Sequence, residues 1–318
     1  MNTIVEKRTR PLISTSRLNQ YSLVMLLVIL LVVMAVWNPR FFNVRNLGSI
    51  LRLSAVVGIA TLGESLVLLI KGVDISVGAV MGLVSVLTAV LLPIVGIFGT
   101  VTLTVAVCAL IGLVTGLLIV KGKIPPIVTT LGMMWLLRGI SGSITDGRIV
   151  RITNESFVAL ANSSFLGSVP YFFIGFIVVG LVASYILDKV NIGKHIYAIG
   201  GSEEAAYYSG INISRVKILV FMMAAITYGI GGLLLSSYLR AGMPFTAQGY
   251  EFRAITSAAL GGIALSGGKG KIGNAVLGAI ILTLLYSVIT SFGISPYLQG
   301  MVEGIVLVVA VYLCQREK

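Results

Sequence analysis

Apolar residues run along this chain in long blocks, and the polar residues between the blocks are few and clustered. A helix needs about 20 mostly apolar residues to cross a bilayer, and a segment surrounded by lipid must satisfy its own backbone hydrogen bonds. The blocks therefore predict an all-α fold, a polytopic membrane helix bundle of about ten transmembrane helices. They lie near residues 21–37, 50–70, 76–97, 100–120, 125–145, 169–187, 217–240, 253–266, 273–292 and 297–314.

Two parts of this pattern are irregular. The 253–266 block is short and glycine-rich, which predicts a re-entrant or broken helix. The third and fourth blocks are divided only by Pro93, Gly96 and Gly99. We expect one transmembrane domain, residues 21–314, between cytoplasmic tails at 1–20 and 315–318. Residues 241–252 are expected to form an outer loop, which is either solvated or in contact with an external partner.

Composition agrees with an integral membrane protein. Hydrophobic residues make up 57% of the chain and charged residues 11%, whereas a soluble domain has roughly 25% charged residues. The net charge of +12 is scattered over short loops, which argues against a nucleic-acid partner. The two cysteines, Cys108 and Cys314, each lie inside an apolar run, and the chain has only one histidine. We therefore expect neither a disulfide framework nor a metal site.

The basic residues predict the sidedness of the bundle. With ten spans and a cytoplasmic N-terminus, 15 Lys and Arg residues fall on the inner side and 8 on the outer side. Cytoplasmic loops carry such an excess. This topology places the polar segment 188–217, between the sixth and seventh spans, in the cytoplasm.

Segment 188–217 contains the signals of a short helix of about two turns. Ser202 can cap its start, Glu203 and Glu204 favour its first turn, and Gly210 can end it. A helix this short is not stable alone, and at a membrane face it suits contact with another protein. The candidate contact residues are Gly200, Gly201, Ser202, Glu203, Glu204, Ala205, Ala206 and Gly210.

Ionisable residues inside spans are costly and often functional. Glu64, Arg138 and Glu303 are the candidates. Glu64 either forms a wall of a polar cavity, with Thr61 and Thr130 as further candidate walls, or one of the two glutamates pairs with Arg138. Asp74 is expected to cap the helix that starts near Ser76 or to face Lys71.

No enzyme signature is present: the sequence has neither a Walker A motif nor a nucleophile elbow nor a zinc-protease motif. We expect no catalytic residue and no bound cofactor. Uphill transport by this chain would then take its energy from a gradient or from another polypeptide.

Five stretches of the sequence carry a further signal: Pro39–Phe42 with Asn46, Gly72–Gly78, Lys123–Leu131 with Arg138-Gly139, Asn191–Lys217, and Gly249–Glu251 with Leu260–Gly262 and Ser266–Gly268. In this order along the chain, they resemble the permeases of ATP-binding-cassette sugar importers, the ribose, arabinose, xylose and galactose permease family. The sequence departs from the usual pattern of that family at three places: Lys71 brings a charge to the first turn, Ser202 stands where asparagine is commoner, and the pair Tyr207-Tyr208 replaces Arg-Leu.

The resemblance implies a permease subunit in a bacterial inner membrane. It implies a cytoplasmic sugar-transport ATPase docked on segment 188–217, which uses the ATP, and a periplasmic or extracellular substrate-binding protein. It also implies a dimer with a second copy or a homologous permease. Within this class the cargo could instead be autoinducer-2, a nucleoside or a branched-chain amino acid. A stand-alone secondary transporter and a membrane scaffold are the alternatives from other classes.

Overall fold

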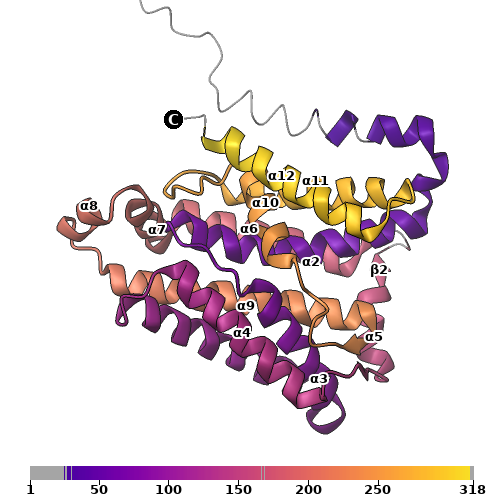
Figure 1. Ribbon diagram of the computed structural model, residues 1–318, viewed down its shortest axis with the longest axis horizontal. Helices are drawn as coiled ribbons and strands as arrows, with labels where there is room; N and C mark the ends of the chain where they lie inside the picture. The colour runs from indigo at the N-terminus through magenta and orange to yellow at the C-terminus, as the bar shows by residue number, and fades with distance from the viewer. Residues whose placement is uncertain (1–24, 26, 30, 166, 168, 316–318) are drawn as a thin grey trace, which may run out of the picture.

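The computed structural model describes residues 25, 27–29, 31–165, 167 and 169–315, and Figure 1 shows them as a bundle of long helices. The predicted all-α membrane bundle is confirmed, but the predicted number of ten spans is not. Among the described residues, six helices have the length and composition to cross a membrane. They are α2 (Val44–Leu69), α3 (Val77–Val120), α4 (Pro126–Thr145), α6 (Tyr171–Lys189), α9 (Ile213–Leu239) and α11 (Ile272–Ser291).

Helix α3 has 44 residues, enough for about 66 Å of helix, which is twice the thickness of a bilayer core. Its backbone breaks at Gly96, where φ is 68° and ψ is −176°, three residues after Pro93. The break falls where the sequence predicts the boundary between two spans. Both halves pack on α9, since a side chain at Gly232 would meet Met81 and one at Gly229 would meet Cys108.

Helix α10 (Tyr250–Leu260) has only 11 residues, as expected for a broken or re-entrant span. It is preceded by a non-helical stretch, residues 243–249, that packs against the first turns of α3: side chains at Gly78 and Gly82 would collide with the carbonyls of Ala247 and Pro244. The expectation of an outer loop over 241–252 is therefore wrong from residue 243 onward, because residues 243–249 pack on α3 and α10 begins at Tyr250. Ala247, Tyr250 and Glu251 are buried.

The segment 70–76 between α2 and α3 is also non-helical and also lies within the bundle. The backbone N–H of Asp74 donates to Glu64 at 3.2 Å, more than one turn before the end of α2. Helix α3 therefore begins inside the bundle. Its first turn meets the start of α10, because a side chain at Gly78 would reach the carboxylate of Glu251.

The two ends of the bundle carry different short elements (Figure 1). At one end, helices α7 (Asn191–Gly201) and α8 (Glu203–Tyr208) lie near the turns after α2 and α10. At the other end lie η1 (Pro39–Phe42), α5 (Glu155–Asn162) and two small antiparallel sheets, while α12 (Pro296–Gln315) completes the bundle. The sheets pair β1 (Val150–Arg151) with β4 (Ala241–Gly242) and β2 (Ser164–Phe165) with β3 (Val169–Pro170).

Three of the described basic residues can be placed at these ends and follow the predicted partition. Lys71, on the predicted inner side, contacts the end of α7. Arg52, on the predicted outer side, donates to the carbonyl of Ala161 in α5 at 2.6 Å, and Arg151 lies in the β1–β4 sheet. Lys71 thus lies at the opposite end of the molecule from Arg52 and Arg151, whereas Arg138, also counted on the outer side, lies inside the bundle. Which end faces the cytoplasm stays a prediction.

Candidate functional site

Segment 188–217 folds into two short helices joined at Ser202, whose backbone is extended at φ −152°. We predict α8 from the sequence but not α7, although the sequence does contain a periodic signal for α7. Ile196 and Ile199 are buried together with Gly193 and Gly200, and this spacing of three, four and seven residues is the period of one helix face. The glycines of this segment lower its helix propensity, so we do not predict a helix from its periodicity.

Both ends of α8 carry the caps that the sequence predicts. The Ser202 hydroxyl accepts from the backbone N–H of Ala205 at 3.2 Å, and Glu203 and Glu204 occupy the first turn. At the other end Gly210 has φ +79°. Its N–H donates to the carbonyl of Tyr207 at 2.9 Å, and the N–H of Ile211 donates to the carbonyl of Ala206 at 3.1 Å. This pair of hydrogen bonds is the Schellman arrangement.

Helix α8 buries one side and exposes two aromatic rings on the other. Ala206 is buried, whereas Tyr207 and Tyr208 are 68% and 80% exposed and pack edge to face at 5.7 Å. An ion pair of 2.6 Å joins Glu203 to Lys217 at the start of α9. A hollow of about 700 Å³ opens between α8 and the neighbouring ends of α3 and α9. An exposed aromatic pair on a supported helix is a surface that another protein can bind.

Helix α7 is fixed to the loop after α10. The Tyr197 hydroxyl donates to the carbonyl of Gly270 at 2.8 Å. Burial and the nearby carboxylate of Asp188 raise the pKa of Tyr197. The phenol therefore stays protonated and keeps this hydrogen bond at neutral pH.

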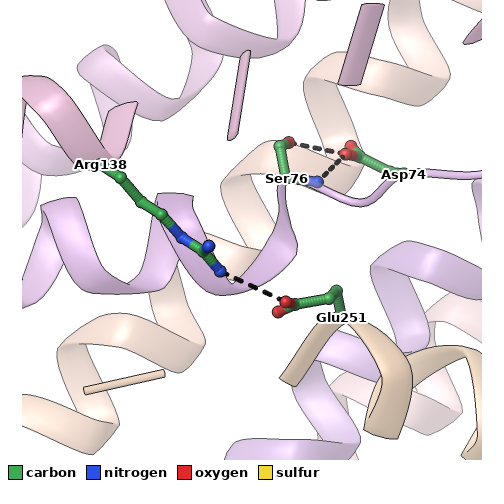
Figure 2. Close-up of polar contacts among 4 residues, drawn as sticks. All are labelled: Asp74, Ser76, Arg138 and Glu251. Atoms are coloured by element: carbon green, nitrogen blue, oxygen red, sulfur yellow. Dashed lines mark hydrogen bonds and ion pairs between the residues drawn. The ribbon is translucent and has the colours of Figure 1, made fainter. Parts of the chain in front are cut away.

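A second polar group lies inside the bundle, where α3 and α10 begin (Figure 2). Arg138 of α4 pairs with Glu251 of α10 at 3.3 Å, and their side chains are 12% and 4% exposed. Asp74 accepts from the backbone N–H of Ser76 at 2.8 Å and from its hydroxyl at 2.6 Å. Asp74 thus holds Ser76, the residue that precedes α3, but accepts from no N–H of the helix itself, so the predicted cap is not formed. We call Glu64, Asp74, Arg138, Tyr228 and Glu251 the intramembrane polar centre.

Glu64 is fully buried and accepts two hydrogen bonds. The Tyr228 hydroxyl donates to it at 2.9 Å and the backbone N–H of Asp74 at 3.2 Å. The predicted pairing of Glu64 or Glu303 with Arg138 is wrong: Arg138 pairs with Glu251, and Glu303 pairs with Arg253 at 3.3 Å. Glu251 was not predicted as the partner, because the residues that precede it have the composition of a loop. In the structure these residues pack inside the bundle.

Thr61 and Thr130, the other predicted cavity walls, are buried in helices. The Thr61 hydroxyl donates to Val57 at 2.8 Å, and the Thr130 hydroxyl donates to Val73 at 3.3 Å. A role for Thr61, Glu64 and Thr130 along a substrate path stays a prediction. Among the described residues, no group of three or more His, Cys, Asp or Glu side chains is placed to hold a metal ion.

Residues 46–311 match the family described as the permease component of branched-chain amino acid transport systems. The chain belongs to this permease family. The matched residues include both the intramembrane polar centre and α7–α8. No solved structure shows significant similarity to the chain.

Several relatives are similar over nearly the whole length of the chain, and they are described as permeases for sugars. The ribose import permease of Haemophilus influenzae is 35% identical over 90% of this chain and 90% of its own length. The ribose import permease of Escherichia coli K12 is 34% identical over 95% of both chains. The L-arabinose transport system permease of the same strain is 33% identical over 92% of this chain and 89% of its own.

Proposed function

We propose that this chain is the membrane-spanning subunit of an ATP-driven, binding-protein-dependent importer of a monosaccharide. The observation that carries the proposal is α8, a helix with a cap at each end, a buried Ala206 and two exposed tyrosines at one end of a helix bundle. The relatives named above are ribose and arabinose permeases, which favours a pentose or hexose over a branched-chain amino acid, autoinducer-2 or a nucleoside.

The partners follow from the same proposal. A cytoplasmic sugar-transport ATPase binds α8 and supplies the energy, because the sequence of this chain has no Walker A motif with which to bind a nucleotide itself. A substrate-binding protein delivers the sugar at the opposite end. Two permeases, identical or homologous, enclose the path in the inner membrane of a bacterium. ATP-driven approach of the two α8 helices moves the bundles between inward-open and outward-open states.

A stand-alone secondary transporter is the competing function, and it needs no ATPase. The test replaces Gly210 with Asp. The left-handed backbone at φ +79° accepts Asp better than most residues, and a side chain there meets no atom within 4 Å of its Cβ. The variant therefore keeps its fold and places a charge beside the two tyrosines. We expect the ATPase that copurifies with the tagged chain, and uptake of labelled ribose, arabinose and galactose, to be lost together.

Gly147→Asp is the matched control. Gly147 has φ +70° and the same open surroundings, but it follows α4 at the other end of the bundle. That variant should retain the ATPase. If Gly210→Asp abolished neither ATPase capture nor sugar uptake, the importer proposal would be wrong and a secondary carrier would be favoured.

A further inference from the structure

Three segments that are distant in sequence interlock where α7 ends, and we call them the three-segment joint: Leu69–Lys71, Gly200–Gly201 and Gly267–Gly268. The N–H of Gly268 donates to the carbonyl of Leu69 at 2.9 Å. A side chain at Gly200 would collide with that carbonyl and with the amide of Gly268. The backbones are thus in direct contact, and movement of one segment displaces the others.

The side chain of Lys71 contacts the other two segments of this joint. Its ammonium donates to the carbonyl of Gly201, the last residue of α7, at 3.2 Å. A cation at a helix C-terminus satisfies a free carbonyl and favours the helix dipole. The Lys71 stem packs on Gly267, where a side chain would collide with it.

The backbone of Lys71 is left-handed, with φ +63°. Glycine adopts this conformation at no steric cost, whereas other residues are strained in it. Such strain persists only when the surroundings fix it. Lysine at this position is therefore explained by what its side chain contacts and not by the turn itself.

A short stretch of chain connects Lys71 to the middle of the bundle. Two residues later, the carbonyl of Val73 accepts from Thr130 of α4 at 3.3 Å. The N–H of Asp74 donates to Glu64, and the Asp74 carboxylate accepts from Ser76, the residue that precedes α3. Displacement of α7–α8 thus reaches the first turns of α3 and α4 through a few residues of non-helical backbone.

We infer that Lys71 is a positioning residue that couples α7–α8 to segment 71–76, so that force on α8 moves the starts of α3 and α4. This inference rests on the proposed function, because it assigns the route by which ATP-driven movement at α8 reaches the intramembrane polar centre. It predicts a residue whose loss spares ATPase docking and uncouples ATP use from transport.

The test uses the full importer, purified through a tag on this chain together with its ATPase, in proteoliposomes with the binding protein and labelled ribose, arabinose or galactose. Lys71→Met keeps most of the aliphatic stem and removes the donor. We expect it to bind the ATPase as the wild type does, with sugar moved per ATP hydrolysed reduced about five-fold, within the range known for residues along a coupling route. Lys71→Arg, which keeps a donor, should restore most of that ratio.

Lys123→Met is the matched control. Lys123 is an exposed lysine with a left-handed backbone, φ +55°, in the turn between α3 and α4, and in the described part of the chain its side chain has no hydrogen bond or ion pair. Its substitution should leave the ratio unchanged. Lys71→Gly serves as a second test variant. Glycine relieves the backbone strain at this position, so we expect the Lys71→Gly permease to accumulate in the membrane even if the Lys71→Met permease does not.

The inference is overturned if the Lys71→Met or Lys71→Gly permease moves as much sugar per ATP as the wild type, or if Lys123→Met lowers the ratio equally. Failure of the proposed function is a separate outcome, since the wild-type chain would then neither retain the ATPase nor import any of the three sugars.

Discussion

Gly200 and Gly201 are adjacent in the chain but have opposite surroundings. A side chain at Gly200 would collide with the backbones of Leu69 and Gly268, whereas one at Gly201 would meet nothing within 4 Å. Neither residue has a left-handed backbone. The need for glycine at the first position is therefore one of space alone.

Gly200→Ala is predicted to lower the free energy of unfolding by about 3 kcal/mol, because the methyl group must push two backbones apart. Gly201→Ala is the matched comparison, and it should change stability by less than about 1 kcal/mol in the stabilising direction, since alanine favours a helix over glycine. Unfolding in mixed micelles with increasing SDS measures both. Equal stability of the two variants would contradict the close contact at Gly200.

Single residues could be predicted from the sequence where their partners are local. Ser202 and Gly210 cap α8 as predicted, because a cap is made with residues two to four positions away. Asp74 likewise contacts a near neighbour, Ser76, although it does not cap α3 as predicted. The partner of Arg138 could not be predicted, because Glu251 lies 113 positions away and only the packing of α10 brings it near.

At the scale of elements, the Arg138–Glu251 ion pair links α4 to α10. With side chains 12% and 4% exposed, loss of one partner leaves the other charge buried and unpaired. Arg138→Met is predicted to lower the free energy of unfolding by about 3 kcal/mol. The double variant Arg138→Met/Glu251→Met should recover all but about 1 kcal/mol of that loss, because it buries no charge.

A double-mutant cycle in the same SDS titration tests this link, with Lys217→Met as control. The Lys217–Glu203 pair is more exposed, at 20% and 44%, and its loss should cost less than about 1 kcal/mol. Additive losses in the double Arg138/Glu251 variant would contradict the account, since they would mean that the two charges do not interact.

Long apolar helices were predictable, and irregular backbone inside the bundle was not. Hydropathy predicted α2, α6, α9 and α11, because each contains a long stretch that is mostly apolar. It misassigned residues 243–249 to an outer loop, since polar and turn-forming residues look alike whether they face water or pack on glycines. Gly78 and Gly82 create the space for that stretch, but the sequence alone does not reveal what fills it.

At the scale of the whole molecule, the arrangement of the ends separates Lys71 from Arg52 and Arg151, as the predicted sidedness requires. The turn at Lys71, helices α7 and α8, and the loop containing Gly268 share one end, whereas α5 and the β1–β4 sheet share the other (Figure 1). An importer driven by a cytoplasmic ATPase requires the first end to face the cytoplasm. The excess of lysine and arginine predicts that orientation.

Labelling of a single cysteine at Tyr208 tests this requirement directly. The variant Tyr208→Cys is made in a chain with Cys108 and Cys314 changed to alanine, and Ile149→Cys, at an exposed position of the other end, serves for comparison. A membrane-impermeant maleimide should label position 208 only in inside-out vesicles and position 149 only in right-side-out vesicles. Labelling of position 208 from the periplasmic face would contradict an α8 that binds a cytoplasmic ATPase, and with it the proposed mechanism.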